Sequence, residues 1–134
     1  LPPDKKDAPL VAIVIGDLGI SASGTADAFT KMPSPVTFAL ARYGADLQKL
    51  AERGRAGKHE VLLQVPMEPF DYPDNDPGPQ TLLTSLTPEQ NIDRLHWLMS
   101  RFQGYVGLIS FMGARFTASE RASRRSYVIS PNAD

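Results

Sequence analysis

Continuous apolar runs alternate along this sequence with segments that have the spacing of amphipathic helices. The first run, Leu10 to Ile15, contains no polar residue, which is typical of a parallel strand covered on both faces. Glycines interrupt the pattern before Thr25 to Lys31, which can form a helix that ends near Pro33. The opening of the chain is therefore predicted to be a strand, a turn and a helix.

The alternation repeats along the rest of the chain. Further strands are predicted at Val36–Leu40, Val61–Val65 and Tyr105–Ile109, and further helices at Ala45–Arg55 and between Thr87 and Gly104. Thr87 starts its helix as a cap, with Pro88 at the first helical position and Gln90 at the capping-box position. Because strands alternate with helices, we predict a parallel sheet with right-handed crossovers, either doubly wound or part of a β/α barrel.

Length and composition fit one globular domain. The chain has 134 residues, of which 42% are hydrophobic. We expect residues 1–9, which are polar and include three prolines, to be a linker without the order of a signal peptide, and residues 10–134 to be the domain. No apolar run reaches the ~18 residues of a membrane span. The net charge of −1 argues against nucleic acid as a partner, and the lack of cysteine excludes disulfides and Cys-ligated zinc.

Functional residues of such folds gather at the carboxyl ends of the strands. The candidates at these positions are Asp17, Arg42, Tyr43, Gln64, Glu68, Ser110, Phe111 and Arg115. We expect their side chains to converge on one edge of the sheet. Between the third strand and its helix, Pro66 to Leu86 is rich in proline and is expected to be an ordered surface loop, which at this length is usually functional.

The turn after the first strand also has a nucleotide-binding interpretation. Gly19-Ile-Ser-Ala-Ser-Gly24-Thr25 has the glycine spacing and the final Thr of a phosphate loop. The Lys that should precede Thr25 is missing, so the charge of a phosphate would be unmatched. A turn relieved by glycine is therefore favoured over a nucleotide-binding α/β domain.

Longer strings of the sequence carry a family resemblance. They are "IGDLG" at 15–19, "HEVLLQVPMEP" at 59–69, "DPGP" at 76–79, "GYVG" at 104–107 and "MGARFT" at 112–117. In order and spacing this pattern resembles the divergent polysaccharide deacetylases, bacterial envelope proteins similar to the NodB-type carbohydrate esterases. The resemblance runs from about Val11 to Thr117 and implies an irregular β/α barrel.

The resemblance implies a role for Asp17 and a change in the residues around it. The family generally has Asp-Asp-Leu-Gly, so Asp17 aligns with the metal-binding acid, which makes it the catalytic and metal candidate. Gly16 stands at the position of the presumed general base. Many relatives have His at Gln64, and Asn-His where Ser110 and Phe111 stand. Zinc, the metal implied for active relatives, prefers nitrogen or sulfur donors, whereas Asp17 and Gln64 supply only oxygen. We therefore expect any divalent metal to be a weakly held hard cation.

The remaining candidates are expected to bind substrate. Glu68 and Arg115 keep the family pattern, and Gln64, Tyr43 and Ser110 complete the set of substrate-binding candidates. A salt bridge from Glu68 to Arg115 that fastens the long loop is an alternative of equal weight.

Two other groups of side chains have structural interpretations. His59 begins its strand at the end opposite Asp17, and His96 is expected to border the helix–sheet core, so neither is a favoured ligand. The acidic group Asp71, Asp74 and Asp76 would suit Ca²⁺, but turn chemistry explains it equally well.

The last segment departs from the family pattern. Ala118 to Asp134 is expected to form a helix and a final strand at Tyr127–Ser130, which is not the remainder of a barrel. We therefore expect only the N-terminal part of the barrel. Its sheet would have a long unpaired edge, so we expect the chain to form a homodimer through that edge or to be unstable.

On this resemblance we expect a divergent polysaccharide deacetylase-like protein of carbohydrate metabolism, located in the periplasm or cell envelope. Active relatives are metal-dependent hydrolases of C–N amide bonds, and here that N-deacetylase activity is expected to be weakened or lost. The expected partner is a polysaccharide or peptidoglycan-like glycan. The alternative is a non-catalytic envelope domain that binds a glycan or a protein.

Overall fold

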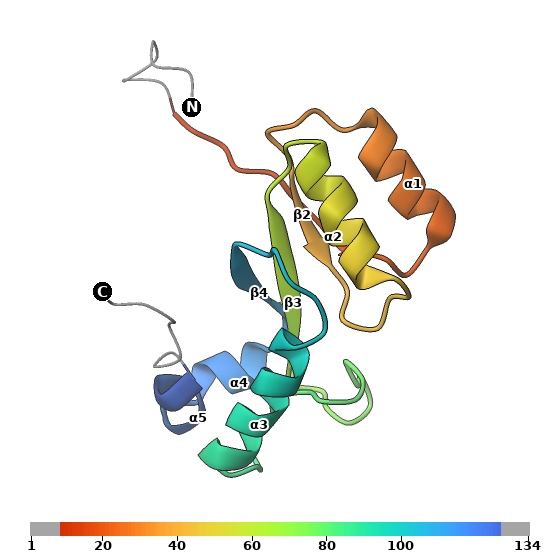
Figure 1. Ribbon diagram of the computed structural model, residues 1–134. Helices are drawn as coiled ribbons and strands as arrows, with labels where there is room; N and C mark the ends of the chain where they lie inside the picture. Colours follow the sequence, from red (N-terminus) through yellow and green to blue (C-terminus); the bar gives the residue numbers. More distant parts are fainter. Residues whose placement is uncertain (1–8, 127–134) are drawn as a thin grey trace, which may run out of the picture.

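Four parallel strands form a sheet in the computed structural model, which describes residues 9–126 (Figure 1). The strands are β1 (Val14–Leu18), β2 (Thr37–Leu40), β3 (Val61–Met67) and β4 (Gly107–Met112), in the order β1-β2-β3-β4. The helices are α1 (Ala22–Lys31), α2 (Leu47–Ala56), α3 (Pro88–Met99), α4 (Ala114–Ala118) and α5 (Glu120–Ser126). Every strand pairing is parallel, so the predicted α/β fold is confirmed.

The first strand begins later than its apolar run. Leu10 and Val11 are exposed, and β1 starts only at Val14. The neighbouring strand explains this difference, because Val14 pairs with Thr37 at the start of β2, and Pro35 before it has no N–H to donate to a ladder. An apolar run becomes a strand only where a partner strand lies beside it.

The end of the described chain also differs from the prediction. β4 begins at Gly107, because Tyr105 belongs to the turn after α3, where its hydroxyl donates to the Met99 carbonyl at 3.2 Å. The helix expected after residue 118 is α5, and the short helix α4, which was not predicted, precedes it. The strand predicted at Tyr127–Ser130 lies outside the described residues.

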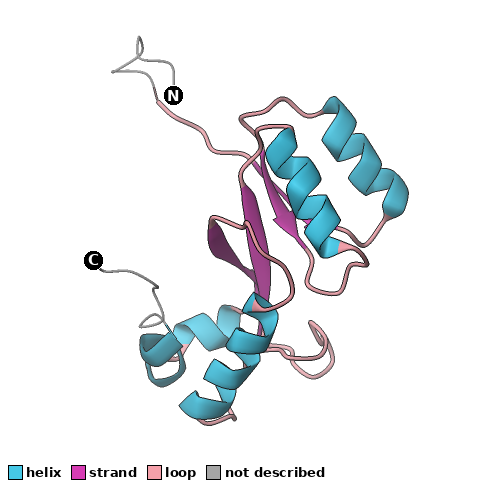
Figure 2. Ribbon diagram, in the orientation of Figure 1, coloured by secondary structure: helices cyan, strands magenta, loops and turns pink. Residues whose placement is uncertain are grey.

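Helices α1 and α2 lie side by side on one face of the sheet (Figure 2). Strand side chains that point toward them, those of Phe38, Leu40, Val61, Leu63 and Val65, are at most 1% exposed. Gly54 permits the close approach of α2, since a Cβ at this residue would lie 3.0 Å from Val61 Cγ2. The hydrophobic core lies between the helices and the sheet, and Leu95 and Leu98 of α3 and Phe116 of α4 also belong to it.

The long loop after β3 is ordered, as predicted, and it returns to the end of that strand. Leu82 forms a parallel bridge with Met67, and the Glu68 N–H donates to the Leu82 carbonyl at 2.9 Å. Buried Asn91 of α3 accepts a hydrogen bond from the Leu83 N–H and donates one to the Leu83 carbonyl. These bonds close the base of the loop.

The start of α3 follows the sequence signals. The Thr87 hydroxyl accepts a hydrogen bond from the Gln90 N–H at 3.2 Å, and the Gln90 side chain accepts one from the Thr87 N–H at 3.0 Å. The predicted capping box, with Pro88 in the first turn, is therefore confirmed. None of the helices within residues 9–126 has the length and apolar character needed to cross a membrane.

We predict that Thr87→Ala lowers the free energy of unfolding by about 1 kcal/mol, because the Gln90 N–H loses its acceptor. The measurement is urea denaturation followed by circular dichroism. Ser85→Ala, which alters another exposed hydroxyl before the helix, is the control and should change stability by less than about 0.5 kcal/mol. Equal losses in the two variants would contradict the capping role.

Candidate functional site

Gly16 and Asp17 lie where β1 leaves the regular sheet. The pairing of β1 with β2 shifts between Ile15 and Leu18, which is a bulge, and Asp17 has a positive φ of 58° within it. The Asp17 side chain is exposed. The bulge therefore presents a carboxylate to solvent at the carboxyl end of β1, where the sequence placed its catalytic candidate.

The turn that follows is built by side-chain hydrogen bonds. The buried Thr25 hydroxyl accepts a hydrogen bond from the Gly19 N–H at 2.9 Å, and Ser21 caps α1 by accepting one from the Gly24 N–H. Because Thr25 is committed to this turn, the glycine-rich stretch forms the structural turn that the sequence favoured over a phosphate loop.

Gln64 fills the space beside Gly16. A Cβ at Gly16 would lie 2.8 Å from Gln64 Nε2, although β2 separates their two strands. On the face of the sheet that Gln64 shares, the intervening residues are Ala39 and Ala41, which alternate with Leu40 and are small and fully buried, so the Gln64 side chain has room to cross. Gln64 is only 6% exposed, and within residues 9–126 its Oε1 has no hydrogen-bond partner. The amide therefore occupies the place that a longer side chain at residue 16 would need.

Arg42 and Tyr43 follow β2 and hold the long loop. The Arg42 Nη2 donates to the Pro77 carbonyl, and the Tyr43 hydroxyl donates to the Pro79 carbonyl. The Arg42 guanidinium is buried, lies 4.1 Å from the centroid of the Tyr43 ring and 5.2 Å from that of Phe111, and its Nε has no partner among the described residues. The loop is thereby fixed beside the carboxyl end of β2.

Glu68 and Arg115 hold the other side of the loop. Glu68 Oε2 accepts hydrogen bonds from the Thr84 N–H and hydroxyl at 2.5 and 2.8 Å, and Oε1 pairs with Arg115 Nη1 at 3.3 Å. Arg115 Nη2 donates to the Phe70 carbonyl at 2.7 Å. The Glu68 side chain is 6% exposed and that of Arg115 44%. This clasp is the salt bridge considered as the alternative to ligand binding, and only Arg115 keeps access to solvent.

Ser110 lies on the opposite face of the sheet from Gln64. Gln64 pairs with Ile109, whereas Ser110 pairs with Val65, whose side chain is in the helix-covered core. Because side chains alternate along a strand, Ser110 shares the face of Val65. It is exposed there, since α1 and α2 cover the sheet at β2 and β3.

The structure therefore brings residues together in three groups along one edge: Gly16 with Gln64, Arg42 with Tyr43 and Phe111, and Glu68 with Arg115. Asp17 follows Gly16 in the bulge and is exposed. Ser110 is on the far face. The sequence did not predict that Thr84 donates two hydrogen bonds to Glu68, because Thr is common in loops and its distance along the chain from Glu68 matches no known motif. It also missed the packing of Gly16 against Gln64.

The two histidines lie away from these groups. His59 is buried, its Nδ1 lies 2.8 Å from the Val36 carbonyl, and its ring stacks on Phe38 at 4.0 Å, so its predicted structural role is confirmed. His96 is exposed at the end of α3 and does not border the core, contrary to the prediction, because Leu95 and Leu98 occupy the inward positions.

The residues present do not fit zinc. Within residues 9–126, no three His, Cys, Asp or Glu side chains lie together in a way that would hold a metal ion, and this includes the acidic loop residues 71, 74 and 76. Asp17 is exposed, and Gln64 adds only an amide. Zinc sites use three or four ligands with nitrogen or sulfur prominent among them, so this donor set lacks both the number and the type.

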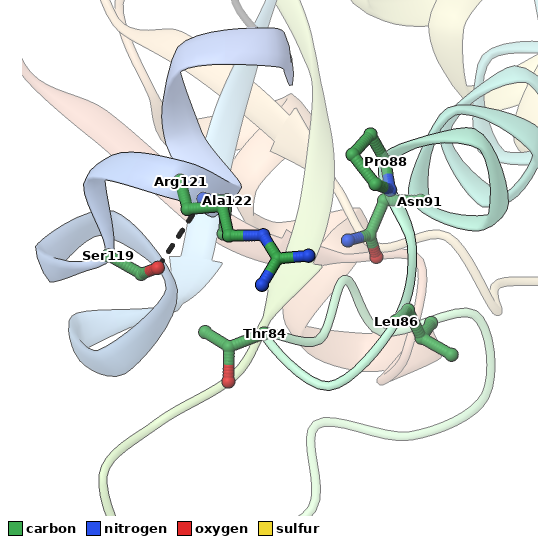
Figure 3. A pocket seen from close by; sticks show the side chains of 7 residues that line it. All are labelled: Thr84, Leu86, Pro88, Asn91, Ser119, Arg121 and Ala122. Carbon is green, nitrogen blue, oxygen red and sulfur yellow. Dashed lines mark hydrogen bonds between the residues drawn. The ribbon is translucent and has the colours of Figure 1, made fainter.

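A separate hollow lies between the start of α3 and α5 (Figure 3). It is lined by Thr84, Leu86, Pro88, Asn91, Ser119, Arg121 and Ala122. Both polar atoms of Asn91 are bonded to Leu83, and the Ser119 hydroxyl accepts from the Ala122 N–H at 3.4 Å. These groups are engaged in holding the loop and α5, so the hollow adds nothing to the candidate site.

Comparison with known proteins agrees with the motifs. The family model described as divergent polysaccharide deacetylase matches residues 13–129, which extends past the last motif at Thr117. The chain is similar to an uncharacterized protein from Agrobacterium tumefaciens whose crystal structure gives a TM-score of 0.83 at 42% identity. The match covers 86% of this chain and 47% of that one, so this chain spans about half of that protein's length. No curated protein matches the chain.

We predict that Gly16→Ala destabilises the protein by about 1–3 kcal/mol, because the added Cβ forces the buried Gln64 amide to move. Combining it with Gln64→Ala should abolish the Gly16→Ala penalty, which gives a coupling energy measurable by urea denaturation of all four proteins. Gly24→Ala is the control, because a Cβ there meets only Ser21 at 3.4 Å. Additive effects at 16 and 64 would contradict the packing argument.

We also predict that Glu68→Gln destabilises by about 1.5–3 kcal/mol, because it removes charge-assisted hydrogen bonds and points an NH₂ group at existing donors. Limited proteolysis should cut the loop at residues 69–81 faster in this variant. Glu60→Gln changes an exposed carboxylate elsewhere and should leave both measurements unchanged. An intact loop in Glu68→Gln would show that the clasp is dispensable.

Proposed function

The chain belongs to the divergent polysaccharide deacetylase family, and from this premise we propose that it binds an N-acetylated glycan of the bacterial cell envelope, with metal-dependent N-deacetylase activity weakened or lost. The proposed binding surface is the carboxyl edge of the sheet. Both the envelope location and the glycan are part of the proposal.

The packing of Gln64 against Gly16 is the observation that carries the loss of activity. A deacetylase needs a base that takes a proton from the attacking water. Residue 16 has no side chain, and Gln64 Nε2 lies 2.8 Å from where its Cβ would be. An amide cannot replace a carboxylate as a base, and Asp17 alone does not complete a metal site. Within residues 9–126, this edge of the sheet therefore lacks both the base and the metal ligands that hydrolysis requires.

Glycan binding is supported by the side chains that remain accessible at this edge. Asp17 is exposed, Arg115 keeps 44% of its side chain accessible, and the Phe70 and Tyr43 rings are 62% and 42% exposed. Carboxylate and guanidinium groups hydrogen-bond sugar hydroxyls, and aromatic rings stack on the apolar faces of sugars. Both carboxylate oxygens of Glu68 are already engaged by Thr84 and Arg115, so we propose that Glu68 positions Arg115 and does not bind the glycan itself.

We test this function with chitin and peptidoglycan oligomers, measuring binding by calorimetry and deacetylation by acetate release in the presence of added Zn²⁺ or Mg²⁺. We expect the dissociation constant to increase at least tenfold in Asp17→Ala or Arg115→Ala. We expect acetate release with a turnover number far below roughly 1 s⁻¹, the lower end of the range typical of enzymes. Glu60→Gln should bind as the unaltered chain does.

Two results would overturn the proposal. Rapid acetate release that Asp17→Ala abolishes would establish a working deacetylase. A complete lack of binding to both oligomers would remove the glycan, leaving the alternative of an envelope domain whose partner is a protein.

A further inference from the structure

Three arginines lie where the carboxyl end of β2 meets α3 and the long loop, which is drawn in green beside α3 in Figure 1. Arg94 of α3 donates through Nη1 to the Thr81 carbonyl of that loop at 2.5 Å. Arg42 donates to the Pro77 carbonyl of the same loop. Arg101, just after α3, donates through Nε to the Arg42 carbonyl at 3.4 Å. These hydrogen bonds join the end of α3 to the edge of the sheet that is proposed to bind a glycan.

These three guanidinium groups have no acidic partner among the described residues. None of them takes part in a salt bridge within residues 9–126, and each donates hydrogen bonds only to backbone carbonyls. Asp76, which precedes Pro77 in the loop, accepts instead from the Gly78 N–H at 2.8 Å. A guanidinium is always charged in proteins, and a neutral carbonyl does not neutralise it. This part of the described surface therefore has a positive charge that an anionic group on a ligand would match.

Two aromatic rings are exposed beside these arginines. Tyr43 is 42% and Trp97 41% exposed. The Cζ of Arg42 lies 4.1 Å from the centroid of the Tyr43 ring, and the Cζ of Arg101 lies 5.1 Å from that of Trp97. Because an arginine packs on each ring, the ring is held in place and its exposed part lies next to a positive charge. Rings in this position suit a sugar that carries a carboxylate.

We propose that the glycan bound at the carboxyl edge is anionic, and that it extends over Tyr43 to a second subsite formed by Trp97 and Arg101. The proposal rests on the glycan-binding function proposed above and names the class of glycan. The indole ring stacks on the apolar face of a sugar. The two Nη groups of Arg101, which donate no hydrogen bond within residues 9–126, donate to a carboxylate of the glycan. Arg42 is buried, so it positions Tyr43 and does not touch the ligand.

The location of this subsite separates it from the unpaired edges of the sheet. Helix α5 lies near the start of α3, where Pro88 and Asn91 line the hollow between them. Trp97 and Arg101 are at the other end of α3, toward β2. The segment that follows is tied to α2, because the Gln103 N–H donates to the side chain of Gln48 at 2.9 Å. The exposure of Trp97 and Arg101 therefore does not arise from the missing neighbours of β1 and β4.

The test compares two glycans with the same N-acetylated backbone. Chitin oligomers are neutral, whereas peptidoglycan strands freed of their peptides carry a carboxylate on every second sugar. By calorimetry at low salt, we expect the 134-residue chain to bind these strands at least about tenfold more tightly than chitin oligomers of equal length. The preference should decrease in about 1 M salt, where the Debye length is about 3 Å, and should disappear when the carboxylates are methylated.

Substitutions locate the preference on the surface. Arg101→Gln should abolish the preference for the anionic strands and leave chitin binding nearly unchanged, whereas Trp97→Ala should weaken the binding of both glycans. Arg53→Gln is the matched control, because Arg53 is also exposed and its Cζ also lies 5.1 Å from an aromatic centroid, that of Phe29. This variant should bind as the unaltered chain does, and circular dichroism checks that all three variants are folded.

The outcomes distinguish this inference from the proposed function. Equal affinity for chitin and for the anionic strands would overturn the inference while leaving glycan binding at the carboxyl edge intact. A preference that survives Arg101→Gln, or that Arg53→Gln reduces equally, would overturn the placing of the subsite. If neither glycan binds, the proposed function fails and the inference fails with it.

Discussion

Parallel pairing of the four strands is the constraint on which the rest of the structure depends. It brings the carboxyl ends of β1, β2 and β3 to one edge, although the residues concerned are separated by up to about 50 positions in the sequence. Asp17, Arg42 and Glu68 lie at the same edge through this pairing, and Arg42 and Glu68 both hold the long loop. Within residues 9–126 the same pairing leaves one side of β1 and one side of β4 without a neighbouring strand.

The candidate site shows how one small residue changes the chemistry available to its neighbours. With no side chain at Gly16, Gln64 crosses β2 above Ala39 and Ala41 and takes the vacant space. Restoring an acid at residue 16 would therefore require Gln64 to leave. The two positions act as one unit, so the proposed loss of hydrolytic function rests on the packing as well as on the residue types.

The long loop is held in place by side chains that the sequence presents as candidate functional residues. Arg42, Tyr43 and Arg115 each donate to a loop carbonyl, and Glu68 accepts from Thr84. Buried hydrogen-bonding groups need partners, and backbone carbonyls in a proline-rich loop have few backbone donors available to them. These side chains have groups that could hydrogen-bond a sugar, but in the structure they position the loop that forms part of the proposed glycan-binding surface.

The sequence by itself determined the alternation of strands and helices as far as β4, the capping box of α3, the structural role of His59 and the family, because these depend on local periodicity and on strings of adjacent residues. Only the tertiary structure decided the late start of β1, the face on which Ser110 lies, and the placing of Gln64 beside Gly16. The physical reason is that each of these depends on which strand lies alongside and in what register, and an ångström-scale contact between distant residues leaves no trace in the spacing of either one.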